Sequence, residues 1–119
     1  MSDLNLERIV GKLEAFGYPV FNLDLNKDEW RDNKSFFVYD ENGEVRPAGN
    51  SRLQYSIEFT LMFITLEESA VDIIEVVENL AGTGLIFDGA IPETPKLKDT
   101  DQIAKAITWT FHRIVKVKC

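Results

Sequence analysis

Residues 52–82 carry the clearest pattern of hydrophobic and polar positions in the chain. Every second residue is apolar over 53–63, which is the period of a strand with one buried face. Beyond Thr65 the apolar residues recur every three or four positions, as they do along one face of a helix. Thr65 and Glu68 match a capping box, so the helix is expected to begin at Thr65 and to end at Gly82. The segment therefore predicts a long strand that leads directly into a helix.

The two faces of this strand differ along its length. One set of alternate positions is apolar and is expected to face the core: Leu53, Tyr55, Ile57, Phe59, Leu61 and Phe63. The other set is polar until Met62 and Ile64, where both faces become apolar. That end is expected to be covered on both sides, and the second cover is either another part of the same chain or a second subunit. The helix that follows is expected to bury one stripe, made of Ala70, Ile73, Ile74, Val77, Leu80 and Ala81.

Shorter patterns predict the remaining elements. A helix is expected over 2–16, ended by Gly17, and strands over 18–25, 35–40, 85–91 and 103–119, with a polar loop over 26–34. Asn42-Gly43 is typical of a tight hairpin turn, so the residues from Val45 onward are expected to return along 35–40. The order helix, strand, strand, strand, helix, strand, strand predicts a single α+β domain. Its sheet is expected to be mixed but mostly antiparallel, with about five strands and both helices packed on one face.

Two strands are expected to be irregular, and two to be unusually long. Gly89 permits a bulge in the strand over 85–91. In the last strand Arg113 interrupts the apolar positions and Ile114 the polar ones, which a bulge near Arg113 would explain. The strands over 53–65 and 103–118 exceed the usual five or six residues, so their ends are expected to overhang the helices. An overhang of this kind must be exposed, paired or covered by another subunit.

Composition narrows the class of protein. The chain has 119 residues, a size that suits one domain, and 45% of them are hydrophobic. A formal net charge of −7 argues against nonspecific binding to nucleic acid through a basic surface. No apolar run approaches the roughly 20 residues that a transmembrane helix needs, and the acidic start lacks the features of a signal peptide. The single cysteine, Cys119, excludes an internal disulfide and a cysteine metal cluster, so we expect synthesis in the cytoplasm and no membrane partner.

Residues that could carry catalysis are sparse. His112 is the one histidine, and it falls on a polar position of a strand, where no nucleophile accompanies it in the pattern. Gly82-Thr83-Gly84 lacks the preceding strand, the following helix and the lysine of a phosphate-binding loop. We predict no catalytic, cofactor-binding or metal-ligating residue. An enzymatic or small-molecule-binding function would instead need charged groups that converge in a deep cleft around His112.

The order of the elements resembles that of the tail terminator (tail completion, head-tail joining) proteins of long-tailed bacteriophages and prophages. The resemblance rests on a first helix that ends in FGYPVF, on SFFVYDENGEV and RLQYSIEFTLMF on either side of a long loop, on the helix EESAVDIIEVVENL, and on the final pair LIFDGAI and DTDQIAKAITWTFHRIVKV. It implies a virion structural protein that forms a ring, typically a hexamer, on the last ring of the tail tube. Such a ring stops polymerisation of the tube and offers the surface to which the head attaches. The implied partners are the tail tube protein and the head connector proteins, and the implied location is the virion tail, after synthesis in the cytoplasm of the bacterial host.

Exposure and charge, rather than a family motif, indicate which residues could make these contacts. The candidate interface residues are Trp30, Arg46, Arg52, Met62, Ile64, Glu68, Asp72 and Glu75. Solvated loop charges and a solvated helix face are the plainer explanation of the charged members. The alternative function is a small acidic protein-binding module, of the immunity or inhibitor type, that covers a basic site on its partner. The motivation for this alternative is the net charge together with an acidic helix stripe made of Glu68, Asp72, Glu75 and Asn79.

Overall fold

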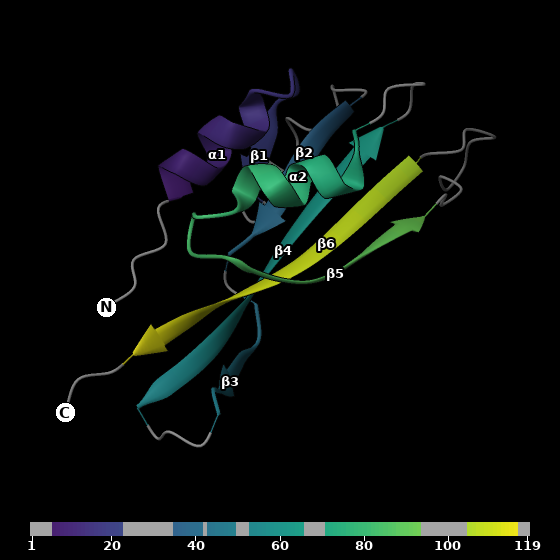
Figure 1. The fold of residues 1–119 in the computed structure, drawn as a ribbon. Helices are drawn as coiled ribbons and strands as arrows, with labels where there is room; N and C mark the ends of the chain where they lie inside the picture. The colour runs from purple at the N-terminus through teal and green to yellow at the C-terminus, as the bar shows by residue number, and fades with distance from the viewer. Residues whose placement is uncertain are drawn as a thin grey trace.

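The computed structural model describes residues 6–22, 35–41, 43–49, 53–65, 71–93 and 105–116. These residues form two helices and six strands: α1 (Leu6–Glu14), β1 (Val20–Asn22), β2 (Ser35–Asp40), β3 (Val45–Pro47), β4 (Gln54–Thr65), α2 (Ile73–Leu80), β5 (Ile86–Glu93) and β6 (Lys105–Lys116). The sheet has the order β1-β2-β4-β6-β5, and β3 pairs with β4 beside this path (Figure 1). Strands β1 and β2 are parallel, and every other described pair is antiparallel. The predicted α+β class with a mixed sheet is confirmed, but the described sheet has six strands instead of five, because β3 is a strand of its own.

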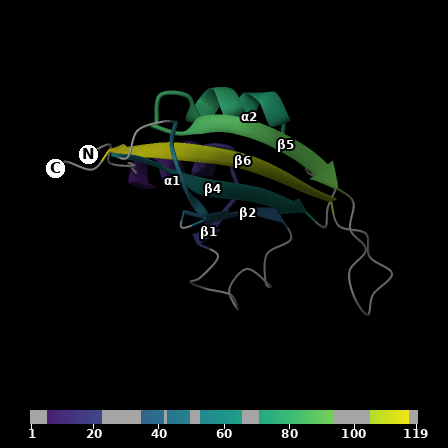
Figure 2. The same cartoon turned by 90° about the horizontal axis from the view of Figure 1, so that it is seen from below.

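Both helices contribute to one hydrophobic core on one face of the sheet. Helix α1 buries Ile9 and Leu13 completely, and α2 buries Val76 and Leu80. The sheet meets them with the buried side chains of Phe37, Tyr39, Phe59, Leu61, Phe63, Trp109 and Phe111. The indole Nε1 of Trp109 donates a hydrogen bond to the carbonyl of Ile73 at 3.1 Å, which ties strand β6, between β4 and β5, to the first residue of α2. In Figure 2 α2 lies against one side of the long curved strands β5 and β6.

Helix α1 ends as its sequence predicts. The last helical residue is Glu14, and Gly17 takes a φ of +93°, a conformation that favours glycine because other residues meet a steric penalty there. The N–H of Gly17 donates to the carbonyl of Glu14 at 2.9 Å, and the N–H of Phe16 to that of Leu13 at 3.1 Å. These bonds satisfy two carbonyls at the helix end.

Helix α2 begins later than the capping box predicts. Its N-cap is Asp72, whose carboxylate accepts hydrogen bonds from the N–H groups of Ile74 at 2.9 Å and Glu75 at 3.1 Å. Thr65 is instead the last residue of β4, and its buried hydroxyl lies 2.7 Å from that of Ser35. The prediction of a capping box at Thr65 is therefore wrong; its partner Glu68 lies outside the described residues.

The buried face of α2 also differs from the predicted stripe. Val76, which was not in the stripe, is fully buried, whereas the side chain of Ile74 is 69% exposed. Ala81 is the exposed C-cap instead of a core residue. Ile73, Val76, Val77 and Leu80 are spaced one, three or four residues apart and share one face of the helix, so the buried face is turned toward Val76 and away from Ile74.

Strands β2 and β3 do not form the predicted hairpin. Both pair with the same edge of β4, β2 from Ser35↔Thr65 to Asp40↔Thr60 and β3 from Val45↔Ile57 to Pro47↔Tyr55. Between these two paired stretches of β4, the Gly43 N–H donates to the Glu58 carbonyl at 3.0 Å and the Glu58 N–H donates to the Glu44 carbonyl at 2.9 Å. A Cβ on Gly43 would lie 2.7 Å from the Glu58 carbonyl oxygen, so glycine is needed there for close approach and not for a turn.

Strands β4 and β6 pair over their full length without a register shift, from Gln54↔Lys116 to Thr65↔Lys105. The predicted bulge near Arg113 is therefore wrong. The shift lies in β5, between Phe87 and Gly89, which confirms the bulge expected from Gly89.

The long strands extend beyond the two helices (Figure 1). We call this projecting part the overhang and define it by β3 (Val45–Pro47), residues 54–57 of β4 and residues 113–116 of β6. Strand alternation continues through it, so Val45, Pro47, Tyr55, Ile57, Arg113 and Val115 lie on the same side of the sheet as the helices. This side of the overhang is apolar apart from Arg113, although neither helix reaches it.

Candidate functional site

Five of the eight predicted interface residues lie in the described part of the chain, where they are scattered. The other three, Trp30, Arg52 and Glu68, lie outside it. Arg46 lies on β3 with its side chain 67% exposed, and its Nη2 bonds to a carboxylate oxygen of Glu44 at 2.6 Å. This hydrogen bond and the attraction between the two charges raise the pKa of Arg46 and lower the pKa of Glu44. Arg46 is therefore accessible to a partner but already paired.

Met62 and Ile64 lie together on the side of the sheet away from the helices. They are half-buried, and they pair in register with Val38 and Phe36, whose side chains are buried. The ring of Phe21 from β1 packs edge-on against Phe36, with 6.0 Å between the ring centroids. At least part of the second cover expected at this end thus comes from the same chain.

The predicted acidic stripe on the second helix does not form a uniform surface. Asp72 is engaged as the N-cap. Asn79 donates from Nδ2 to the carbonyl of Lys12 at 2.8 Å, so it joins α2 to α1. Glu75 and Glu78 are exposed, and their carboxylates form no salt bridge within the described ranges.

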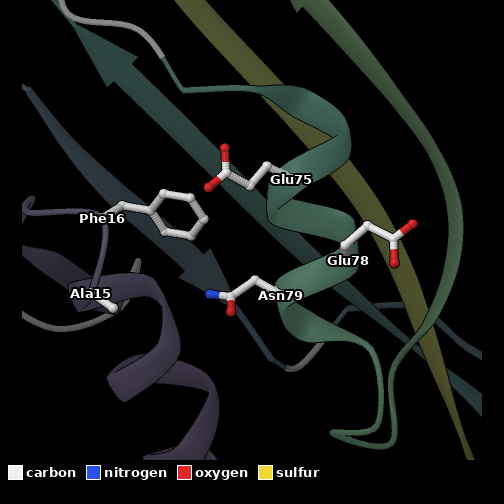
Figure 3. Close-up of a pocket in the computed structure, with 5 residues that line it drawn as sticks. All are labelled: Ala15, Phe16, Glu75, Glu78 and Asn79. Carbon is white, nitrogen blue, oxygen red and sulfur yellow. The ribbon is translucent and has the colours of Figure 1, made fainter.

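A cavity of about 400 Å³ opens between the end of α1 and α2. Its lining consists of Ala15, Phe16, Glu75, Glu78 and Asn79 (Figure 3). Glu75 and Asn79 extend toward the end of α1, whereas the Glu78 carboxylate points away from it. The outer surface of α2 thus combines two unpaired carboxylates with the exposed apolar side chain of Ile74. Glu78 is not among the predicted interface residues, although its spacing of three residues from Glu75 places both on neighbouring parts of one helix surface.

A second concavity, of about 300 Å³, lies around His112 on the side of the sheet away from the helices. It is lined by Glu44, Arg46, Ser56, Glu58, Asp88, Thr110 and His112. The imidazole Nδ1 of His112 lies 2.8 Å from both carboxylate oxygens of Asp88, the residue at the bulge of β5. These two side chains are 25% and 41% exposed, so the site is an open concavity and not a deep cleft.

The chemistry available around His112 is limited. Glu58 faces His112 directly across the β4–β6 pair, and it accepts a hydrogen bond from Thr60 at 3.3 Å. In the part of the chain that the structure describes, no hydroxyl bonds to the imidazole, and no three His, Cys, Asp or Glu side chains are placed to hold a metal ion. The Asp88–His112 pair can orient a polar group, but it lacks the nucleophile that covalent catalysis requires.

Arg113 is the most unusual charged residue of the described sheet. It lies at the base of the overhang, on the side of the helices and opposite Ile57. Its Nε is buried and has no hydrogen-bond partner in the described ranges, and neither described salt bridge includes it. Leaving a buried donor unsatisfied costs about 1–3 kcal/mol. The guanidinium charge of Arg113 therefore has no counter-charge among the described side chains.

The overhang and the β5 edge also expose large apolar side chains. Val45 is 59%, Leu53 42% and Tyr55 39% exposed at or beside the overhang. On β5, which is an edge of the described sheet, Ile86, Phe87 and Ile91 are 47%, 42% and 61% exposed. Exposed apolar groups on a strand edge or projection are therefore candidate surfaces for pairing with another chain.

Neither models of known protein families nor the sequences of curated proteins match this chain. Within the described residues, no helix is long and apolar enough to cross a membrane. The function is therefore argued from the fold and its surfaces.

Proposed function

We propose that this chain is a virion structural protein of a long-tailed bacteriophage or prophage, of the tail terminator kind. In this proposal, copies join head to tail in a ring that caps the tail tube and stops its polymerisation. The ring then provides the surface to which the head attaches. The observation that carries the proposal is the overhang, an extension of the core sheet whose apolar side is covered by neither of the two described helices.

The overhang supports an oligomer because a monomer leaves it incomplete. Tyr55 and Val45 are exposed on the side that is buried elsewhere in the sheet, and Arg113 holds an unsatisfied donor beside them. In the proposal, the cover is a different surface of another copy. When each copy presents its arm to one neighbour and its cover to another, the contact is heterologous, and it generates a ring if the rotation closes.

The charge and the available chemistry agree with such a role. A net charge of −7 suits a ring whose channel lets DNA pass without gripping its phosphates. The Asp88–His112 pair offers no covalent chemistry by itself, so we propose binding and not catalysis. The tail tube protein and the head connector proteins are the proposed partners, one on each face of the ring.

The proposal is tested by the mass of the protein alone and in the presence of tail tubes. The chain has a mass of 13.6 kDa, and light scattering and native mass spectrometry at rising concentrations separate a monomer from a closed ring. The same measurements, with electron microscopy, are repeated after adding the tube protein encoded by a neighbouring gene. A ring in either condition, seated at tube ends, is expected. A monomer in both conditions, with tubes that keep growing, contradicts the proposal.

A second candidate function is a small acidic inhibitor that covers a basic site. The unpaired carboxylates of Glu75 and Glu78 beside the cavity between the helices favour it, because they could receive a basic side chain. The mass measurement separates the two functions. An inhibitor is expected to stay monomeric and to form a one-to-one complex with a basic partner, whereas a ring protein is expected to associate with itself.

A further inference from the structure

We infer that the outer surface of α2 from a second copy covers the helix-side face of the overhang, with Arg113 of one copy against Glu75 and Glu78 of the next. This inference rests on the proposed ring and names its interface. It follows from two surfaces of the same chain that are complementary in both polarity and charge.

The first surface is the helix-side face of the overhang. Five of its six side chains are apolar, namely Val45, Pro47, Tyr55, Ile57 and Val115, and the sixth is Arg113. Over the rest of the sheet this face packs against helices. The missing cover is therefore expected to be helical, apolar at one point and negatively charged at another, so that it can offset the guanidinium charge of Arg113, which neither described salt bridge includes.

The second surface is the outer side of α2. Ile74 is 69% exposed there, and it is an apolar contact that its own core does not use. Glu78 lies one turn along the helix from Ile74, and Glu75 lies next to it toward α1; their carboxylates form no salt bridge in the described part of the chain. This combination of one apolar anchor and two carboxylates matches what the overhang lacks.

Other occupants of the overhang fit less well. A phosphate-rich partner such as nucleic acid would meet Arg113, but it would leave Tyr55 and Val45 without an apolar contact and would face a protein of net charge −7. The overhang and α2 lie on different parts of the monomer (Figure 1), so one copy can use both at once. In the proposed ring each copy presents the two surfaces to different neighbours, so the contact is heterologous.

The test is a charge exchange across the interface. Arg113→Glu and the double variant Glu75→Arg/Glu78→Arg are each expected to raise the concentration needed for assembly about tenfold or more, because like charges then face each other. Combining all three substitutions in one chain restores the attraction, and so does mixing the two variants in equal amounts. Lys105→Glu matches the charge change of Arg113→Glu, and Glu93→Arg makes half the charge change of the double variant. Both lie on exposed residues away from the interface, and they are expected to assemble as the unchanged protein does.

A variant that fails to fold is distinguished by a second substitution. Ile74→Arg alters a side chain that its own monomer leaves exposed, so thermal unfolding of the monomer is expected to stay the same while assembly is lost. Rings that tolerate Arg113→Glu and Ile74→Arg would overturn this interface and leave the ring itself standing. Loss of assembly that the charge exchange does not restore would overturn the pairing. A chain that stays monomeric with and without tail tubes would overturn both the interface and the proposed function.

Discussion

Strands β4 and β6 run through both the helix-covered part of the sheet and the overhang, but their side chains meet different environments in the two regions. In the covered half, Phe59 of β4 and Phe111 of β6 face each other in register and are almost completely buried. Four residues earlier on β4, Tyr55 occupies the same face and is 39% exposed. The alternation of the strand continues past the point where its helices stop. Within the described residues the apolar face is longer than its helix cover, and this difference is the basis of the proposed contact with a second copy.

The largest difference between the two regions is expected in the stability of the monomer. Phe59→Ala should lower the free energy of unfolding by about 3–5 kcal/mol, because it leaves a cavity among close-packed aromatic rings. Tyr55→Ala is the matched control on the same strand face and should change monomer stability much less. Urea unfolding of both variants measures the difference. Equal losses would mean that the overhang belongs to the core of the monomer.

Gly43 tests the connection between the two regions along the edge of β4. Gly43→Ala should destabilise the protein by about 1–3 kcal/mol, because the added Cβ would meet the Glu58 backbone at 2.7 Å. Gly49→Asn, at a turn position with a φ of +62° and open space around it, is the control and should cost less. A Gly43→Ala variant with an unchanged unfolding midpoint would contradict the close approach of Gly43 to the backbone of Glu58.

The start of α2 is tested by removing its cap. Asp72→Ala should lower stability by about 1 kcal/mol, because the N–H groups of Ile74 and Glu75 lose their acceptor. Asp72→Asn, which keeps an acceptor oxygen, should recover most of this loss. Thermal unfolding followed by circular dichroism is sufficient for the comparison. No loss in the alanine variant would place the helix start elsewhere.

The smallest effect on the monomer is expected at Arg46, on the outer side of the overhang. Arg46→Glu removes an ion pair with Glu44 that is exposed to water, so the melting temperature should not change. Assembly with tail tubes should weaken if Arg46 contacts a partner, as its exposed position predicts. Electron microscopy of capped and uncapped tubes measures this effect. A drop in melting temperature would show that Arg46 holds the overhang together instead.

Sequence patterns predicted the elements whose local and long-range preferences agree. The strands over 54–65 and 105–116, the inward position of Phe59, the glycine end of α1 and the bulge at Gly89 all followed from periodicity and glycine chemistry. These features depend on the residues near them. The pairing of β4 with β6 requires the same strand conformation that the local pattern favours, so these predictions agree with the folded chain.

The errors arose where a local signal competed with a distant partner. Asn42-Gly43 favours a hairpin, but β3 gains its hydrogen bonds from β4, which the sequence places later in the chain. Thr65 and Asp72 can both cap a helix, and pairing of Ser35 with Thr65 in the sheet leaves Asp72 as the cap. Arg113 looked like a local irregularity. Its importance depends on the buried Nε and on the end of the helix cover, which are properties of the folded chain.

The proposed contact between the overhang of one copy and α2 of the next is tested most directly with a photo-crosslinker on the overhang. A p-benzoylphenylalanine in place of Tyr55 is irradiated in an equal mixture of isotopically light and heavy protein, assembled alone or on tail tubes. Mass spectrometry then identifies the crosslinked peptides. We predict mixed light–heavy links from position 55 to the 73–80 segment of another copy. Links confined to the same copy, or links between copies that avoid α2, would contradict the central claim.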